Sequence, residues 1–127
     1  MKKPILEIYA LAVCFFTVAC FVITLGIALY DLIQITNPEF TLSAYQYERY
    51  QSNEAFKQSL HLNKDEKVLS DEELTKRREE GHTQAIRAER HEAAQSLVQM
   101  SLIIFIDLIV FIIHWLLAKR VRQSSVV

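Results

Sequence analysis

Glycine, proline and cysteine are scarce in this sequence, which contains two residues of each. Because the two glycines are isolated, there is no glycine-rich loop of the kind that cradles a phosphate group. Cys14 and Cys20 would lie about 9 Å apart on a helix, too far for a disulfide between them. No Ser/His/Asp or Cys/His nucleophile arrangement stands out either. We therefore predict that the protein is not an enzyme and holds no cofactor.

The chain also has almost no net charge. Its 14 lysines and arginines are balanced by 15 aspartates and glutamates, which leaves a formal charge of −1 at pH 7. Proteins that bind nucleic acid as their main partner depend on a basic surface to attract phosphates. The charge balance therefore excludes nucleic acid as the main partner.

Two long segments lack charge almost completely. Residues 8–30 contain no charged side chain, and residues 97–117 contain only Asp107 and His114 as ionisable groups. A helix of roughly 20 apolar residues crosses the hydrocarbon core of a bilayer, which is about 30 Å thick. Both segments are long enough, so we predict an all-α integral membrane protein with two transmembrane helices. The same pattern excludes a soluble single-domain enzyme.

The first apolar segment could instead be a targeting signal. A secretory signal has an apolar region of about 7–15 residues that ends at a cleavage site with small side chains. The segment here is longer and no such site follows it. Residues 17–20 weakly resemble a lipoprotein cleavage box, but the chain stays apolar after Cys20, where a mature lipoprotein would turn polar. We therefore predict a retained membrane anchor.

Small and hydroxyl-bearing side chains gather on one face of the first predicted membrane helix. Their spacing of three or four residues places them in an arc of roughly 140°. This face consists of Glu7, Ala10, Cys14, Thr17, Cys20, Thr24, Ala28 and Asp31. Such faces mark close helix packing in hydrocarbon, where no hydrophobic force drives helices together. We predict packing against the second membrane helix; the alternative is a self-association face or a pore lining.

The second predicted membrane helix carries an acid, Asp107, near its midpoint. A carboxylate at that depth costs about 2.5–3.5 kcal/mol on insertion scales, so it normally faces protein or water, is paired, or is protonated. In a structural role, a protonated Asp107 donates a hydrogen bond to Thr17 or Thr24, or to its counterpart in a neighbouring subunit. In a functional role, a ring of Asp107 side chains selects cations or relays protons. A third interpretation pairs Asp107 with a larger membrane protein.

Asp107 also belongs to a heptad column along one face of its helix. The column consists of Ala93, Met100, Asp107 and His114. A repeat of seven residues is typical of a left-handed helix seam. His114 would lie near the lipid headgroups at the same depth as Glu7 on the first helix. We therefore expect Glu7 to contact His114 or Lys119.

The distribution of basic residues predicts the orientation in the membrane. Basic side chains flank the outer ends of the two apolar segments, at Lys2, Lys3, Lys119, Arg120 and Arg122, whereas acids outnumber bases in the segment between them. Positive charge next to a membrane favours the cytoplasmic side. We predict a bacterial inner (plasma) membrane protein with both termini in the cytoplasm and the central segment in the periplasm.

The sequence pattern between the two apolar segments predicts a helix followed by a polar connection. Pro38 lacks a backbone donor and disfavours helix in the residue before it, so the first helix should end there. A partial apolar stripe then predicts one helix over residues 41–62, with Thr41 as its N-cap and a polar connection after it.

Ser70 and Glu73 have the spacing of a capping box, in which serine and glutamate side chains bind unpaired amides at a helix start. Nothing forbids one continuous helix from there to about Arg122, although Gly81 could weaken it. The chain thus divides into residues 1–36, 37–70 and 71–127, with the second span at about 97–117. The part outside the membrane is predicted to form an antiparallel helical hairpin.

Glu79 and His82 have the spacing of half a carboxylate-bridged metal site in a helical bundle. A complete site needs a matching second motif among apolar side chains, but this pair lies in a segment that is charged all round. A solvated helix face with ion pairs between successive turns explains the pattern better. We predict no metal site.

Two functions fit these observations. The first is a small inner-membrane interaction or accessory subunit that assembles through its membrane helices and its periplasmic hairpin. The second is a homo-oligomeric cation channel or proton pathway that uses Asp107, with Thr17 and Thr24 supplying oxygens and with Glu7 and His114 nearer one end. Besides the lipid bilayer, the expected partner is further copies of the chain or a larger membrane protein.

Overall fold

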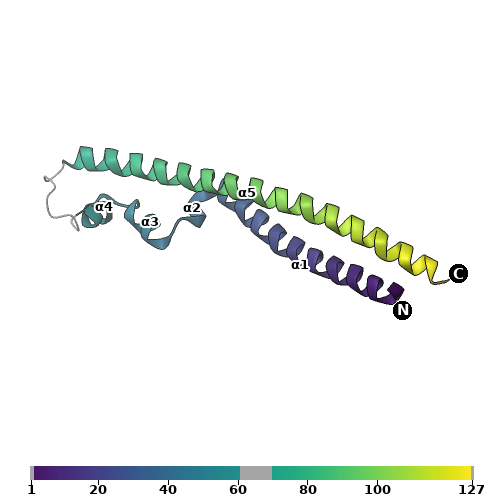
Figure 1. Ribbon diagram of the computed structural model, residues 1–127. Coiled ribbons are helices and arrows are strands. Elements are labelled where there is room, and N and C mark those ends of the chain that lie inside the picture. Colours follow the sequence, from purple (N-terminus) through teal and green to yellow (C-terminus); the bar gives the residue numbers. More distant parts are fainter. Residues whose placement is uncertain (1, 61–69, 127) are drawn as a thin grey trace. The chain divides into compact units, whose positions relative to one another are not determined.

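The structure is a computed structural model that describes residues 2–60 and 70–126. These residues are almost entirely helical and include no strand, which confirms the all-α prediction (Figure 1). The elements are α1 (Lys2–Thr36), α2 (Pro38–Thr41), α3 (Ala44–Arg49), α4 (Asn53–Leu60) and α5 (Asp71–Ser124). The expected polar connection, residues 61–69, lies outside the described residues.

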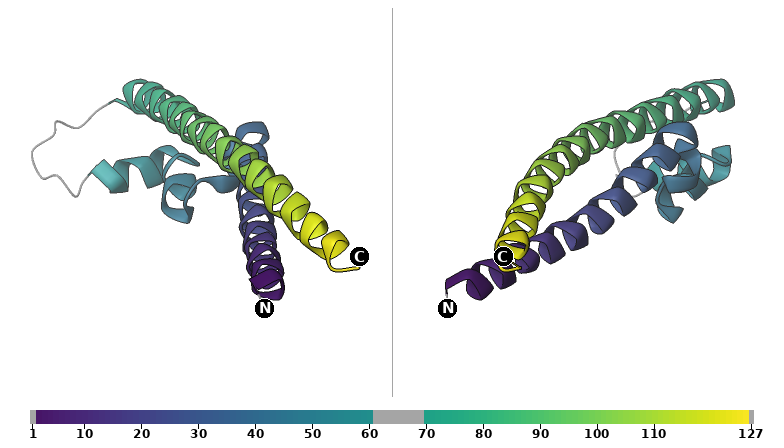
Figure 2. Two further views of the ribbon diagram at one scale, coloured as in Figure 1. Left: turned by 45° about the vertical axis from the view of Figure 1, so that its right-hand side comes forward. Right: turned by 90° about the vertical axis from the view of Figure 1, so that its right-hand side faces the viewer.

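Two of these helices are long and apolar enough to cross a membrane. The candidate spans lie within Pro4–Thr36 of α1 and within Asp71–Ser124 of α5. Helix α5 runs without a break past Gly81 (Figure 2). Its start follows the predicted cap, since the Ser70 hydroxyl oxygen accepts a hydrogen bond from the backbone N–H of Glu73 at 3.4 Å.

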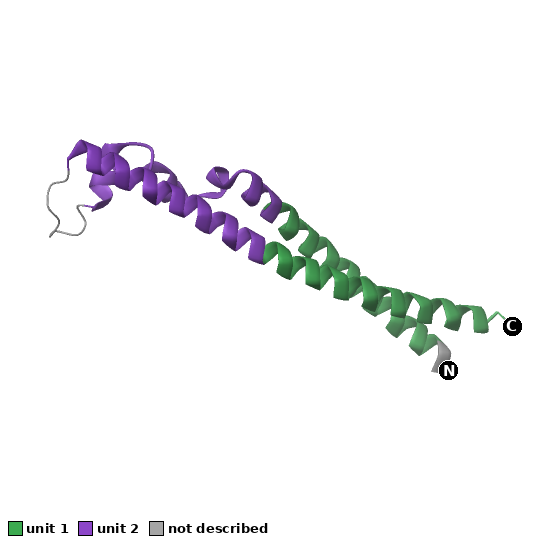
Figure 3. Ribbon diagram, turned by 90° about the horizontal axis from the view of Figure 1, so that it is seen from above, with its two compact units in different colours: residues 1–30, 96–127 green, residues 31–95 purple. Residues whose placement is uncertain are grey.

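The chain forms two compact units, coloured separately in Figure 3. Unit 1 contains residues 1–30 and 96–127, and unit 2 contains residues 31–95. Each unit therefore combines part of α1 with part of α5, and unit 2 also contains α2, α3 and α4.

In unit 1, contacts pair the start of α1 with the end of α5, so the two segments run antiparallel. Glu7 Oε1 lies 3.5 Å from Arg122 Nε, and the rings of Tyr9 and His114 meet edge to face at 5.9 Å. Farther along, Thr17 lines the same pocket as Asp107. Along this series of contacts, the residue numbers increase on α1 and decrease on α5, as expected for antiparallel helices.

The packed faces in unit 1 follow the heptad spacing of a left-handed seam. On α1 the buried residues are Ala10, Cys14, Thr17, Thr24 and Ala28. On α5 the buried or half-buried residues include Met100, Ile104, Asp107, Phe111, His114, Ala118 and Val121. Small side chains on one helix thus face larger ones on the other. Bulky side chains on the opposite side of α1, such as Phe15 and Ile23, are exposed.

Cys20 does not belong to this packed face, contrary to the prediction. Its side chain is exposed, whereas Phe21 is half-buried. A left-handed seam alternates steps of three and four residues. Because Cys14 to Thr17 is a step of three, the next step is four and ends at Phe21.

Unit 2 corrects the prediction of one helix over residues 41–62. Two short helices, α3 and α4, occupy the described part of this range, and Thr41 ends α2 instead of capping a helix start. Ser43 caps α3 by accepting from the N–H of Gln46, and Ser52 accepts from the N–H of Ala55 at the start of α4. Serine side chains compete for backbone groups and favour caps over helix interiors, so they divide the segment.

An aromatic cluster joins the short helices of unit 2 to α5. The ring of Tyr50 lies 5.8 Å from that of His82 and 6.3 Å from that of Phe56, which is buried. A β-carbon added at Gly81 would lie only 2.9 Å from Tyr50 Cε1. Gly81 therefore allows the Tyr50 ring to approach α5 closely, and it does not interrupt the helix.

Specific polar contacts complete unit 2. Asn53 Nδ2 donates to Thr75 Oγ1 at 2.9 Å, and Arg78 Nη1 donates to the backbone oxygen of Gln51 at 3.1 Å. Gln34, in the last part of α1, donates to the Glu89 carboxylate on α5. The first two bonds hold the region around α4 against α5, and the third joins the last part of α1 to α5.

Candidate functional site at Asp107

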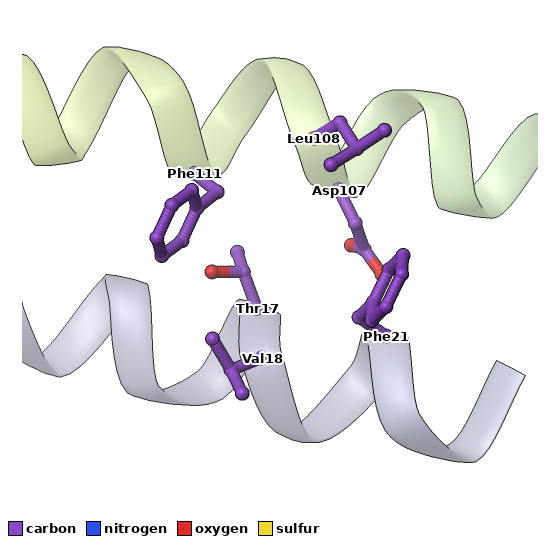
Figure 4. Close-up of a pocket in the computed structure, with 6 residues that line it drawn as sticks. All are labelled: Thr17, Val18, Phe21, Asp107, Leu108 and Phe111. Atoms are coloured by element: carbon purple, nitrogen blue, oxygen red, sulfur yellow. The ribbon is translucent and has the colours of Figure 1, made fainter. Parts of the chain in front are cut away.

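Asp107 lies on α5 within unit 1 and contributes to a pocket between the two helices. The pocket has a volume of about 180 Å³. It is lined by Thr17, Val18, Phe21, Asp107, Leu108 and Phe111 (Figure 4). In Figure 4, Asp107 and Phe111 point from α5 toward α1, and Thr17 points from α1 toward α5. The structure thus brings together two of the predicted site residues, Asp107 and Thr17.

One oxygen of the Asp107 carboxyl group has no hydrogen-bond partner among the described residues. Its Oδ2 atom is buried and accepts no hydrogen bond from the described residues. A buried polar atom without a partner costs about 1–3 kcal/mol, and more when the group is charged. Native structures rarely leave such an atom unpaired without a reason, such as an absent partner molecule.

The predicted hydrogen bonds from Asp107 to Thr17 or Thr24 are not formed. Thr17 Oγ1 donates to the backbone oxygen of Cys14 at 2.8 Å, and Thr24 Oγ1 donates to that of Cys20. The hydroxyl of a threonine in a helix can donate to the backbone oxygen three or four residues earlier in the same helix. Both hydroxyl protons are therefore used locally.

His114 and Glu7 lie toward the same end of unit 1, as predicted. The expected contact between them is not formed. His114 Nδ1 lies 2.8 Å from the backbone oxygen of Val110, and its ring packs on Tyr9. Glu7 pairs with Arg122, although Lys119 lines a pocket of about 210 Å³ beside both. Arg122 lies one helical turn beyond the buried Ala118, and its exposed side chain reaches Glu7 from the edge of the packed face.

Asp31 is a further buried acid that the sequence analysis placed on the packed face without assigning it a role. It lies in unit 2, is only 4% exposed, and its Oδ2 atom has no hydrogen-bond partner among the described residues. Its position directly after the uncharged residues 8–30 was the available signal. The pocket-lining residues Phe21 and Phe111 carried no comparable signal, because one apolar residue among many does not stand out in a membrane helix.

The Glu79–His82 motif does not form a shared site. His82 Nε2 lies 3.3 Å from Glu39 Oε1. Glu79 instead lines a pocket together with Asp71, and His82 is not among the residues that line it. Across the described ranges 2–60 and 70–126, the histidines, cysteines and acids nowhere form a group of three or more that could hold a metal ion.

No family model matches the chain, and searches of curated proteins and of solved structures found no match.

Proposed function

We propose that this chain is a small, non-catalytic interaction subunit of a bacterial inner membrane. In this proposal both termini are cytoplasmic, the two spans belong to unit 1, and the central segment forms a periplasmic helical hairpin. The chain then assembles through its membrane helices and that hairpin with a larger membrane protein or with further copies of itself.

The observation that carries the proposal is the unpaired oxygen of Asp107. Two antiparallel helices supply no donor to Asp107 Oδ2 from the described part of the chain. In a bilayer no water is available to replace that donor, so an unpaired carboxyl group is costly. A donor from another polypeptide would remove this cost and would hold the two proteins together.

The shallow core of unit 1 supports the same conclusion. Its buried side chains on α1 are small, and none of the large side chains among the described residues is fully buried. Large apolar residues on both helices remain exposed, including Phe105 at 63% and Ile106 at 58%. In hydrocarbon, lipid or the packed surface of another membrane helix would cover them.

The alternative function is a homo-oligomeric cation channel or proton pathway through Asp107. In that case Thr17 and Thr24 should point their oxygens into a pore between subunits. Both side chains are instead buried on the face of α1 that packs on α5 within unit 1. This arrangement favours an interaction role for the polar face over a pore lining.

Chemical crosslinking followed by mass measurement in native membranes tests the proposal. We expect a complex that contains this chain and a larger membrane protein in a defined ratio. A ring of identical chains that conducts cations after reconstitution, with conduction lost in Asp107→Asn, would favour the channel. A monomer under all crosslinking conditions would contradict both functions.

A further inference from the structure

We infer that the pocket at Asp107 receives a lysine or arginine side chain from a membrane helix of a different protein. The inference deepens the proposed function, on which it rests, by naming the chemistry of the partner. It depends on three observations: the hydrogen-bonding capacity of the pocket, its apolar wall, and the lack of lysine and arginine in residues 8–30 and 97–117.

The pocket offers acceptors and no side-chain donor. Asp107 supplies a carboxyl group with one unpaired oxygen, and the hydroxyl proton of Thr17 is already engaged with Cys14. The remaining lone pairs of Thr17 can only accept a hydrogen bond. The four other lining side chains are apolar. When Asp107 is ionised, a ligand that satisfies this site must therefore donate, and a cation donates while also neutralising the carboxylate.

The apolar wall suits a long side chain with its charge at the tip. Lysine and arginine bury an apolar stem while the charged end reaches a polar group. Phe21 and Phe111 line the pocket and present rings on which a cation can also be stabilised. A cavity of about 150 Å³ accepts a molecule the size of benzene, so a pocket of about 180 Å³ has room for such a side chain.

A second copy of this chain offers no lysine or arginine at this depth. Residues 8–30 and 97–117 contain no lysine or arginine. A hydroxyl such as that of Ser101 donates to its own helix, in this case to the backbone oxygen of Leu97 at 2.7 Å. A buried acid in a membrane helix is normally paired with an opposite charge or a donor on a neighbouring helix. Charge complementarity therefore points to a different protein.

The test uses the full chain in lipid nanodiscs and a synthetic leucine–alanine peptide that spans the bilayer. One peptide carries lysine at its centre, and a matched peptide carries leucine there. Native mass spectrometry measures the fraction of chain bound as peptide is added. We expect the lysine peptide to bind the wild type about tenfold more tightly than Asp107→Asn, a difference of about 1.4 kcal/mol.

Two controls make the result specific. Asp31→Asn changes another buried acid with an unpaired oxygen, outside the pocket, and should leave binding unchanged. The leucine peptide should bind the wild type and Asp107→Asn equally. Circular dichroism checks that each variant keeps its helical content, so that a loss of binding is not a loss of folding.

Equal binding of the lysine peptide to the wild type and Asp107→Asn would overturn the inference. A homodimer that depends on Asp107 and excludes the peptide would overturn it as well. Neither result decides the proposed function, which fails if the chain is a monomer in its native membrane or forms a conducting ring of identical chains. A native complex together with a negative peptide result would therefore reject the cation and keep the interaction subunit.

Discussion

Units 1 and 2 are held together by different kinds of interaction. In unit 1, two long helices pack along a repeating seam in which small side chains on α1 face larger ones on α5. In unit 2, short helices are positioned by individual contacts, such as the Tyr50 ring against Gly81 and the Asn53–Thr75 hydrogen bond. A repeating seam spreads its stabilisation over many small residues, whereas individual contacts concentrate it in a few.

This difference predicts how each unit responds to substitution. Removing one large residue should damage unit 2 most, because few other side chains share its role. Adding volume should damage unit 1 most, because its small side chains permit close approach of the two helices. The following predictions test this contrast.

The largest effect is expected for Phe56→Ala in unit 2. Phe56 is 5% exposed and lies beneath the Arg49 guanidinium, which is 5.3 Å from the ring centroid. Truncation of a buried phenylalanine costs about 3–5 kcal/mol. We expect the free energy of local unfolding of α4 to fall by about 3 kcal/mol, measured by hydrogen exchange and mass spectrometry.

The matched control is Phe40→Ala, in the same unit. Phe40 is 75% exposed, so its truncation should change the same free energy by less than about 0.5 kcal/mol. Equal effects of the two substitutions would show that unit 2 does not depend on the buried cluster.

The next largest effect is expected when the two cysteines of α1 are each replaced by leucine. Cys14 is 6% exposed and lies in the seam, so extra volume there should destabilise unit 1 by about 1–3 kcal/mol. Cys20 is exposed, and the same replacement should have little effect. Denaturant titration of the full chain in detergent measures the difference. If Cys20→Leu is the more damaging change, the seam assigned to α1 is wrong.

A double-mutant cycle between Gly81 and Tyr50 tests the close approach in unit 2. Alanine favours a helix interior over glycine by about 1 kcal/mol, but its β-carbon would lie 2.9 Å from Tyr50 Cε1. Gly81→Ala should therefore stabilise α5 only when Tyr50 is also replaced by alanine. We expect the two effects of Gly81→Ala to differ by about 1 kcal/mol in hydrogen exchange. Additive effects would mean that the ring does not restrict position 81.

The smallest effect is expected for Arg122→Gln. The Arg122 side chain is 78% exposed, so its ion pair with Glu7 is screened by solvent and worth less than about 0.5 kcal/mol. Its contribution to the stability of unit 1 should fall further as salt is added. A larger, salt-independent loss in denaturant titration would indicate that this pair is buried in the assembled protein.

The same contrast explains what the sequence predicted. The seam of unit 1 follows from residue spacing, so the burial of Ala10, Cys14 and Ala28 could be predicted. Cys20 was assigned wrongly because a face defined by small residues is broader than the seam, which steps from Thr17 to Phe21. The breaks within residues 41–62 could not be predicted from periodicity, because serine caps such as Ser43 depend on local backbone geometry.

The candidate site was predicted only in part. A lone acid in an apolar helix identified Asp107, and its helix face was predicted from the heptad column. Its hydrogen bonds to Thr17 or Thr24 were wrong, because sequence spacing does not show whether a hydroxyl donates to its own helix or across to another. The lack of a partner for Asp107 Oδ2 could not be predicted from the sequence, because it depends on the positions of the surrounding side chains.

The central claim is that Asp107 binds a partner within the membrane, and one comparison tests it most directly. The mass of the complex extracted from native membranes is measured for the wild type, for Asp107→Leu, and for Ser101→Leu as a control at an exposed polar position on the same helix. The account predicts that Asp107→Leu alone reduces the complex to free chain. A complex of unchanged mass and abundance in Asp107→Leu would contradict it.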